Sequence, residues 1–181
     1  MLINMKILDF GCGKRKQKGA TGIDISKDTD ADVIHDLNVF PYPFADNEFD
    51  YVYADNVIEH LGDVVKVLEE LHRITRNGAT LKIIVPFFRS HYAFIDPTHK
   101  HFFTVRSLDY FDSEKDFNQL YKYSRCHFKI KKVLFDENIK HGLFGKVLTW
   151  FANKRPIFYE TKISMIFPLS TITYYLDTLK K

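Results

Sequence analysis

The chain has 181 residues, of which 45% are hydrophobic and 27% are charged, and its formal net charge is +3. These values are typical of a globular domain and argue against a disordered or low-complexity chain. No segment approaches the roughly 18 apolar residues that a membrane-spanning helix needs, and the first residues lack a signal-peptide pattern. The two cysteines, Cys12 and Cys126, lie far apart, which favours free thiols. We therefore expect a single cytoplasmic domain over residues 1–181.

The charges are unevenly distributed along the chain. Residues 1–80 hold 9 Lys and Arg against 14 Asp and Glu, whereas residues 81–181 hold 17 against 9. A basic surface attracts anionic ligands, whether phosphorylated, carboxylated or polymeric. The second half thus predicts an anionic partner, unless its charges only form a solvated surface.

The first predicted element is a strand over residues 3–9, which the turn Asp9–Gly13 (Asp-Phe-Gly-Cys-Gly) follows. Its glycines permit unusual φ values and let the backbone approach a ligand closely. The next predicted strand, over residues 21–25, carries Asp24, and an acid at this place binds ribose hydroxyls in dinucleotide-type folds. A nicotinamide fingerprint needs a third glycine, where this chain has Lys16. The pattern therefore indicates a ribose-bearing cofactor other than a nicotinamide dinucleotide.

Further elements follow in alternation. Asp63 is expected to cap a helix to about Thr75, which the pair Asn77-Gly78 would end in a left-handed turn. A short helix is predicted over residues 107–111. The remaining strands are predicted over residues 33–36, 49–53, 80–85, 128–135 and 172–179. Strands that alternate with helices form a parallel sheet, with a ligand crevice outside the carboxyl ends of the strands.

The segment 86–104 follows a predicted strand end and gathers polar and aromatic side chains. His91, His99 and Asp96 are the candidate catalytic residues, because imidazole is a natural base near neutral pH. Alternatively, His99 only braces the loop through hydrogen bonds. His91, His99 and His101 could also supply three imidazoles to a metal, but no cysteine or glutamate pair stands nearby, so we expect no metal.

The segment 141–168 is rich in aromatic residues and lysines. An apolar stripe at helical spacing predicts a helix that packs as a lid over the sheet edge. The stripe consists of Leu143, Phe144, Val147, Leu148 and Phe151, with Trp150 beside it. As an alternative, a basic amphipathic helix over residues 141–158 contacts an anionic membrane or forms a dimer surface. The sequence leaves the oligomeric state open.

Across residues 6–85 the chain resembles the class I, Rossmann-like S-adenosylmethionine-dependent methyltransferases. The matching pieces, in order, are Leu8-Asp9-Phe10-Gly11-Cys12-Gly13, Asp24, Asp36-Leu37, the run from Pro43 to Asp50, and Glu59-His60-Leu61. The resemblance implies a mostly parallel seven-stranded sheet whose antiparallel last strand lies between the fifth and sixth. The chain departs from the family at Arg15, where the pattern has a glycine. Only eight residues link Gly13 to Gly22, so the first helix must be shortened or replaced by a loop.

The resemblance also implies S-adenosylmethionine as the cofactor. The glycine turn would meet its methionine moiety, Asp24 its ribose and Ile25 its adenine. The cofactor-binding residues expected in this way are Asp9, Phe10, Gly11, Cys12, Gly13, Asp24, Ile25, Asp36, Leu37, Asp55 and Asn56. For Glu59 and His60 the alternative is that they only brace the loop before the helix. Residues 1–85 would form the cofactor half, and residues 86–181 the acceptor-binding and lid half.

We therefore expect methyl transfer from S-adenosylmethionine to a small or lipid-linked, anionic acceptor, for example a sugar or a surface-polysaccharide precursor. The alternatives are a catalytically degenerate cofactor-binding module and a methyltransferase that acts on protein or nucleic acid. Against nucleic acid, the chain shows no appended RNA-binding domain. It has Asp55-Asn56-Val57-Ile58 where such enzymes carry an Asn/Asp-Pro-Pro-Tyr/Phe tetrapeptide.

Overall fold

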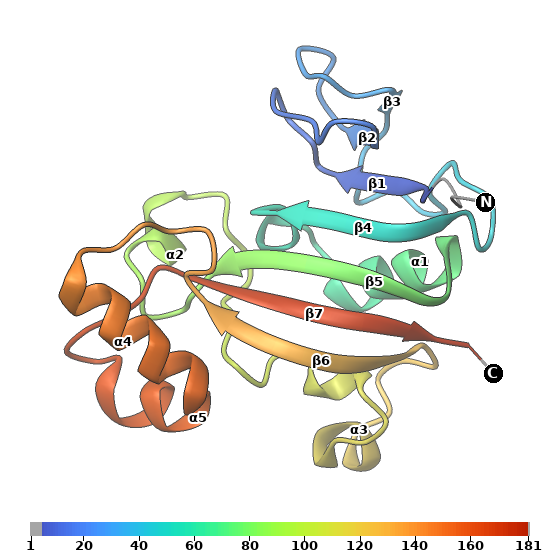
Figure 1. Ribbon diagram of the computed structural model, residues 1–181. Helices are drawn as coiled ribbons and strands as arrows, with labels where there is room; N and C mark the ends of the chain where they lie inside the picture. The colour runs from blue at the N-terminus through green and yellow to red at the C-terminus, as the bar shows by residue number, and fades with distance from the viewer. Residues whose placement is uncertain (1–4, 181) are drawn as a thin grey trace.

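The computed structural model describes residues 5–180, and its strands form one mixed sheet in the order β3-β2-β1-β4-β5-β7-β6 (Figure 1). Strands β1 to β5 are parallel, and β7 runs antiparallel to β5 and β6. The strands are β1 (Ile7–Phe10), β2 (Thr21–Asp24), β3 (Val33–Ile34), β4 (Phe49–Asp55), β5 (Thr75–Pro86), β6 (His127–Phe135) and β7 (Thr171–Leu179). The predicted Rossmann-like α/β sheet with an antiparallel last strand is therefore confirmed. Residues 3 and 4 of the first predicted strand lie outside the described residues.

The connections between strands are unusually poor in helix. Residues 11–20, between β1 and β2, form turns where the family has its first helix, as their small number predicts. The α-helices are α1 (Val64–Ile74), α2 (Tyr92–Ile95), α3 (Asp116–Leu120), α4 (Leu143–Lys154) and α5 (Pro156–Phe158). Single turns of other helix types are η1 (Ile58–His60), η2 (Asp109–Phe111) and η3 (Tyr159–Ile163). The predicted short helix over residues 107–111 is thus reduced to η2.

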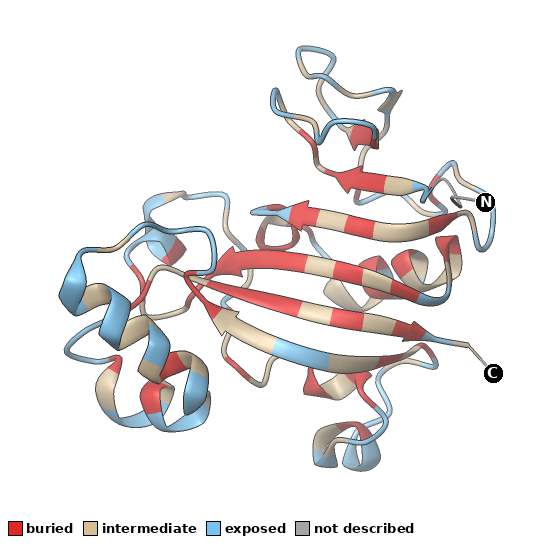
Figure 2. Cartoon of the chain, in the orientation of Figure 1, coloured by how far each residue is buried: buried red, intermediate tan, exposed pale blue. Residues whose placement is uncertain are grey.

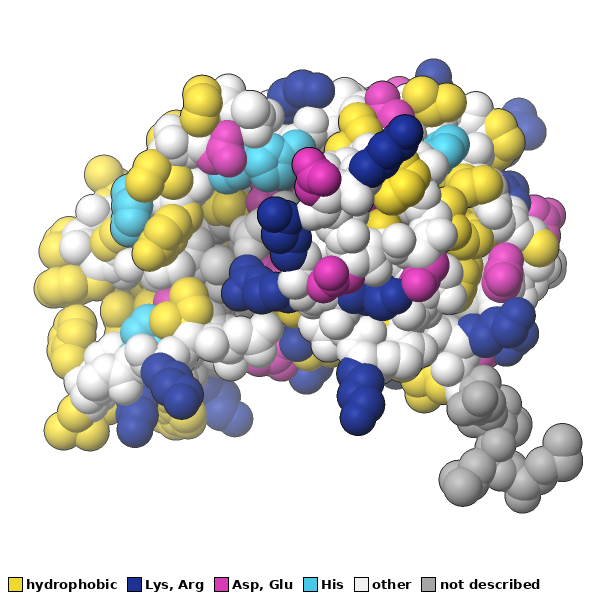
Figure 3. Space-filling model, turned by 90° about the horizontal axis from the view of Figure 1, so that it is seen from above, with side chains coloured by type: hydrophobic (Ala, Val, Ile, Leu, Met, Phe, Trp, Pro, Cys, Tyr) yellow, Lys and Arg dark blue, Asp and Glu magenta, His cyan; other side chains and the backbone are white. Residues whose placement is uncertain are grey.

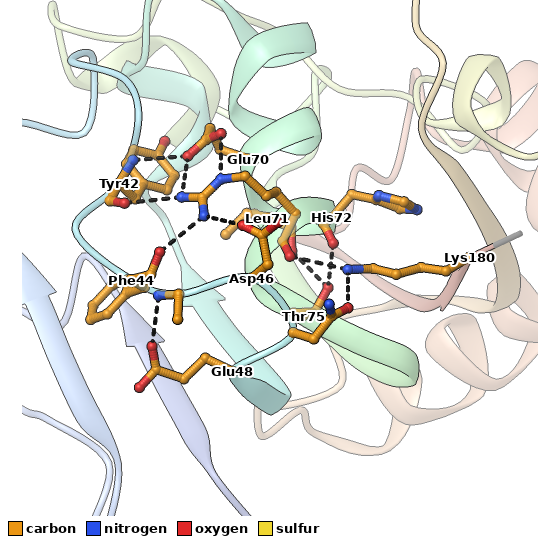
Figure 4. Close-up of polar contacts among 12 residues, drawn as sticks. Tyr42, Phe44, Asp46, Glu48, Glu70, Leu71, His72, Thr75 and Lys180 are labelled. Atoms are coloured by element: carbon orange, nitrogen blue, oxygen red, sulfur yellow. Dashed lines mark hydrogen bonds and ion pairs between the residues drawn. The ribbon is translucent and has the colours of Figure 1, made fainter.

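Helix α1 begins and ends close to the predicted residues, but other residues than predicted stop it. The Asp63 carboxylate accepts a hydrogen bond from Lys66 N at 3.0 Å, which caps the first turn. The expected stop at Asn77-Gly78 is wrong, because the chain passes from Ile74 directly into β5 at Thr75. The buried Thr75 hydroxyl donates to the Leu71 carbonyl at 2.7 Å and satisfies the last turn without a loop (Figure 4). Gly78, with φ of +79°, lies instead where the register between β4 and β5 shifts.

The central strands are covered by a helix on one face only. Within residues 5–180, α1 packs behind the sheet, and no helix crosses the near face of β4, β5 and β7 in Figure 1. Half-buried residues alternate with buried ones along these strands (Figure 2). On the open face, Lys82 Nζ lies 2.8 Å from Glu137 Oε2 and 5.4 Å from the ring centre of Tyr175. The sheet therefore has one apolar face, which packs against α1, and one more polar face in contact with solvent.

The lid helix is only partly buried. Helix α4 forms where the apolar stripe predicts it, and Leu148 and Phe151 pack against the core. Leu143, Phe144 and Trp150, by contrast, are 82%, 65% and 63% exposed. The expected burial of the whole stripe is therefore wrong, because α4 lies at the end of the sheet and only one side of it meets the core (Figure 2). None of the helices within residues 5–180 is long and apolar enough to cross a lipid bilayer.

Arg73 of α1 ties down the loop between β3 and β4, which follows the expected adenine-binding residues. Its guanidinium donates to the carbonyl oxygens of Tyr42 and Phe44, both at 2.9 Å. It also donates to Glu70 at 2.8 and 2.9 Å and to Asp46 at 2.7 Å. Figure 4 shows these acceptors converging between the loop and α1. A planar, five-donor fork suits this arrangement, whereas a single ammonium group does not.

We predict that Arg73→Lys lowers the free energy of unfolding by about 1.5–3 kcal/mol, because several hydrogen bonds with a charged donor are lost together. Urea unfolding of the purified protein measures the change. Arg76→Lys is the matched control, since its side chain is 42% exposed and pairs with Asp50. It should cost less than about 1 kcal/mol. Equal losses in the two variants would contradict the anchoring role of Arg73.

Candidate active site

The candidate site lies at the edge where β1, β2, β4 and β5 end. The carboxyl ends of parallel strands meet at one edge of a sheet, and ligands bind in the crevice outside them. Three hollows adjoin there, and all three are lined in part by Asn56, which follows β4. We call them the adenosine hollow, the methionine hollow and the acceptor cleft.

The glycine turn after β1 forms the wall between the first two hollows. Gly11 has φ of +70°, and an added Cβ would lie 2.4 Å from Cγ2 of Val57. A side chain at this position would therefore be strained and would clash with the turn after β4. Gly13, with φ of +53°, has open space where its Cβ would stand. The backbone of Gly11 therefore closely approaches the Val57 side chain, and this contact requires a glycine at position 11. The sequence did not indicate the role of Val57.

The adenosine hollow has a volume of about 290 Å³. The Asp24 carboxylate stands in its wall, where it accepts hydrogen bonds from Gly13 N and Ser26 N, each at 3.0 Å. Ile25 is 61% exposed, so its apolar side chain is available to a flat ring. The expected residues that line this hollow are Gly11, Asp24, Ile25, Asp36, Leu37 and Asn56. It is also lined by Asn38, Val57, His60 and Leu61, whose place there the sequence did not predict.

The methionine hollow, of about 510 Å³, combines acidic and basic side chains. Asp9 is 3% exposed, and its carboxylate accepts a hydrogen bond from Gln17 N at 2.6 Å. Burial raises the pKa of Asp9 above its usual value. The Asp55 carboxylate accepts from Tyr53 Oη at 2.8 Å and from Asn56 Nδ2 at 2.7 Å. The other residues lining the hollow are Gly11, Cys12, Gly13, Lys14, Arg15 and Gln17.

Two of the expected residues in this region have buried side chains. The side chain of Phe10 is fully buried, so only its backbone is available to a ligand. Burial raises the pKa of the Cys12 thiol to about 11, which keeps it neutral at physiological pH. Lys14 and Arg15, by contrast, were not predicted to line the site. The sequence did hold a signal for Arg15, because this residue stands in the glycine turn at a position where the family has a glycine.

The acceptor cleft, of about 590 Å³, runs from the end of β4 toward α2. Asp96 and His99 line it, as do the exposed side chains of Tyr92 and Ile95. His91 is not among its lining residues, since it precedes α2 and its ring lies against Tyr92, with centres 4.0 Å apart. The structure thus brings two of the three candidate catalytic residues to the cleft and leaves the third outside.

The turn η1 joins the cofactor side of the site to the acceptor side. The Glu59 carbonyl oxygen accepts hydrogen bonds from Lys100 N at 2.8 Å and His101 N at 3.2 Å. His101 Nε2 lies 2.8 Å from the Leu61 carbonyl oxygen, to which it must donate. The backbone of Glu59 therefore braces the loop. Its side chain points into the protein and is fully buried.

Comparisons with known proteins agree with this geometry. Residues 8–83 match a family model described as a methyltransferase domain. A structure of an S-adenosylmethionine-dependent methyltransferase from Archaeoglobus fulgidus aligns with a TM-score of 0.59 and 16% identity, over 96% of this chain and 86% of that chain. One from Mesorhizobium loti aligns with a TM-score of 0.57 and 13% identity, over 96% and 90%.

A third similar structure contains a protein partner. It is a chain of the complex formed by the Trm112 methyltransferase activator of Haloferax volcanii, with a TM-score of 0.58 and 15% identity, over 98% of this chain and 84% of that chain. No protein of curated function matches the sequence. The chain thus carries a match to a methyltransferase domain over residues 8–83, and it shares the class I, Rossmann-like fold of these methyltransferase structures.

The residues present fit S-adenosylmethionine. Gly11 lines both the adenosine and the methionine hollow, and a ribose in the adenosine hollow would meet the Asp24 carboxylate. The carboxylates of Asp9 and Asp55 would face a methionine ammonium group, and Arg15 its carboxylate. When bound, the cofactor supplies an activated sulfonium methyl group, so the protein has mainly to hold an acceptor in line.

We predict that Asp24→Ala weakens S-adenosylmethionine binding by about 1.5–3 kcal/mol, because charge-assisted hydrogen bonds to the ribose are lost. Isothermal titration calorimetry with the cofactor and with its demethylated product measures the effect. Asp28→Ala, an exposed position two residues beyond the hollow's Ser26 contact, is the matched control and should leave the affinity unchanged. Unchanged affinity in Asp24→Ala would remove Asp24 from the cofactor site.

Proposed function

We propose that the protein transfers a methyl group from S-adenosylmethionine to an anionic, lipid-linked acceptor at a membrane surface. The observation that carries this proposal is the position of residues 140–168, which we call the apolar-basic segment. The chain lines the acceptor cleft at Asn138 and Ile139 just before this segment and at Ser170 and Thr171 just after it. A surface that contacts this segment would therefore lie beside the acceptor cleft.

The apolar-basic segment combines exposed apolar side chains with positive charge. It contains five Lys and Arg and a single acid, Glu160, whose carboxylate accepts a hydrogen bond from Val105 N at 2.6 Å. Its exposed apolar residues are Leu143, Phe144, Val147, Trp150, Ile157, Phe158, Met165, Ile166 and Phe167. Figure 3 shows hydrophobic side chains gathered at the end of the molecule that holds α4 and α5 in Figure 1, with Lys and Arg beside them. This composition suits the interface of an anionic bilayer.

The acceptor cleft has features that suit such a substrate. Tyr92, Ile95 and Ile139 are exposed apolar residues in its wall, and they would contact the chain of a lipid. Asp96 and His99 supply polar groups nearer the cofactor hollows. An acceptor whose apolar part stays in the bilayer could present its nucleophile to His99, while its anionic group stays near the Lys and Arg side chains of the apolar-basic segment.

The reaction asks little of the protein beyond position and a proton acceptor. An oxygen or nitrogen nucleophile must approach the methyl group in line and lose its proton. We propose that His99 handles the nucleophile, because it lines the cleft and has one ring nitrogen free. Its Nδ1 lies 3.0 Å from the Ala93 carbonyl oxygen, to which it must donate. Its Nε2 therefore keeps a lone pair.

We predict that anionic vesicles bind the protein and shift the fluorescence of Trp150 to shorter wavelengths. Trp150 is the chain's single tryptophan, and its side chain is 63% exposed on α4. Vesicles with 30% phosphatidylserine in phosphatidylcholine should produce the shift, which should weaken as salt rises because exposed charges are screened over about 8–10 Å. Vesicles of phosphatidylcholine alone should produce little or none.

The basic residues give this prediction a matched control. Reversal of Lys154 and Arg155 to Glu should weaken vesicle binding by at least about tenfold, since each basic residue near such a surface contributes about 1 kcal/mol. Reversal of the exposed Lys18 and Lys27, outside the apolar-basic segment, changes the net charge equally and should have a smaller effect. Equal effects, or no binding by the unchanged protein, would rule out this membrane contact.

We predict that His99→Ala lowers methyl transfer by about a hundredfold or more, the usual contribution of a positioned general base. Cofactor affinity should stay within a few-fold, because His99 is not among the residues of the adenosine and methionine hollows. Transfer of labelled methyl groups into extracted anionic lipids measures the activity, and calorimetry measures the affinity. His91→Ala tests the candidate outside the cleft, and a larger loss there would overturn the assignment to His99.

A further inference from the structure

Glu59 is a buried carboxylate that the methyl-transfer chemistry described above does not use. Its side chain is fully buried in the turn η1, and neither carboxylate oxygen has a hydrogen-bond partner within residues 5–180. A buried carboxylate without a partner is strongly unfavourable, so such a group indicates a cation that completes its surroundings.

Two imidazoles face this carboxylate from different segments. His60 is its neighbour in η1, and His99 reaches it from the loop after α2. His99 Nε2 lies 4.0 Å from Glu59 Oε1, and the ring centres of His60 and His99 are 4.6 Å apart. One candidate ligand atom from each of the three residues lies within 4.8 Å of the other two.

Hydrogen bonds fix the tautomer of both rings. The Ala93 carbonyl oxygen can only accept, so Nδ1 of His99 carries the proton. Thr98 Oγ1 donates to the Asp96 carboxylate at 2.7 Å and must therefore accept from His60 Nδ1, 2.8 Å away. Each ring thus keeps a lone pair on Nε2. Each of the three residues offers a ligand atom within 4.8 Å of the other two, and outer hydrogen bonds fix the orientation of both rings, as is usual for metal-binding histidines.

We propose that Glu59, His60 and His99 bind a divalent transition-metal ion. Two imidazoles and one carboxylate form a ligand set that suits Zn²⁺, Fe²⁺ and similar ions. Metal–ligand bonds of about 2.1 Å allow ligand atoms up to about 4.2 Å apart, so the 4.0 Å separation of His99 Nε2 and Glu59 Oε1 fits directly. The widest separation, within 4.8 Å, closes with a shift of about half an ångström.

This proposal reverses the expectation of no metal. The sequence suggested His91, His99 and His101 as possible metal ligands, because they lie in one loop. The structure separates them, since His101 bonds to the Leu61 carbonyl and His91 lies outside the cleft. The carboxylate that completes the set comes from the turn after β4 and is distant in sequence.

The location gives the ion a role in the proposed reaction. His60 and His99 line the acceptor cleft, and His60 also lines the adenosine hollow. With Nε2 of His99 bound to the ion, that ring would no longer accept the proton in the proposed reaction. Three protein ligands leave open coordination positions instead, at one of which an acceptor hydroxyl could bind and have its pKa lowered. This consequence rests on the proposed function, whereas metal binding itself does not.

Titration of the full chain with metal alone tests the site. After treatment with a chelator, the protein should bind Zn²⁺ and Co²⁺ with a stoichiometry of one, measured by calorimetry and by the visible absorption of bound Co²⁺. Glu59→Gln and His99→Ala should weaken binding by more than about a hundredfold, beyond the effect of outer residues. His91→Ala, in the same loop but outside the cleft, is the matched control and should bind as the unchanged protein does. No saturable binding, or equal binding by all variants, would overturn the proposal.

Two further variants separate ligation from a purely structural role. Thr98→Val removes the hydroxyl that orients His60 and should weaken Co²⁺ binding by about 10–100-fold. In the chelated protein, Glu59→Gln should be at least as resistant to thermal unfolding as the unchanged chain, because the carboxylate has no partner within residues 5–180. A marked loss of stability would show that Glu59 pairs with His99 as a structural ion pair, against the proposal. Because no cofactor or acceptor is added, failure here leaves the proposed methyl transfer standing.

Discussion

The site depends on one backbone acceptor, the carbonyl oxygen of Glu59. It receives the amide groups of Lys100 and His101 and so holds the loop after β5 against the turn after β4. The first segment carries residues of the acceptor cleft, and the second separates that cleft from the adenosine hollow. Because two amides share one oxygen, this contact positions the two halves of the site relative to each other.

Much of the fold could be predicted from the sequence because its signals are local. The alternation of apolar runs, the acid at the end of β2 and the shortness of the link between β1 and β2 each depend on a few adjacent residues. The end of α1 lies close to the predicted Thr75, but the predicted stop at Asn77-Gly78 was wrong for a non-local reason. The Thr75 hydroxyl also meets that of Thr178 at 2.9 Å, so a strand near the other end of the chain helps to fix where the helix stops.

The residues of the site also fall into two groups, those that adjacent residues predict and those that depend on distant contacts. The glycine turn and Asp24 could be located from adjacent residues, whereas the trio of Glu59, His60 and His99 could not. Its members converge only when the loop after β5 folds back over η1, a contact made by backbone groups that every residue carries. A motif search can see side chains at fixed spacing. It has no access to a hydrogen bond between main chains about forty residues apart.

The open face of the sheet has a consequence for what the enzyme can accommodate. Lys82, Glu137 and Tyr175 form a polar ladder on the side of the strands that a doubly wound protein buries under helices. A third layer would have to desolvate these charges, so the two-layer arrangement is built into the strand sequence. The cleft wall at Ile84 and Thr173 continues onto that face. One wall of the acceptor cleft is therefore formed by the sheet itself, on the face that a doubly wound protein covers with helices.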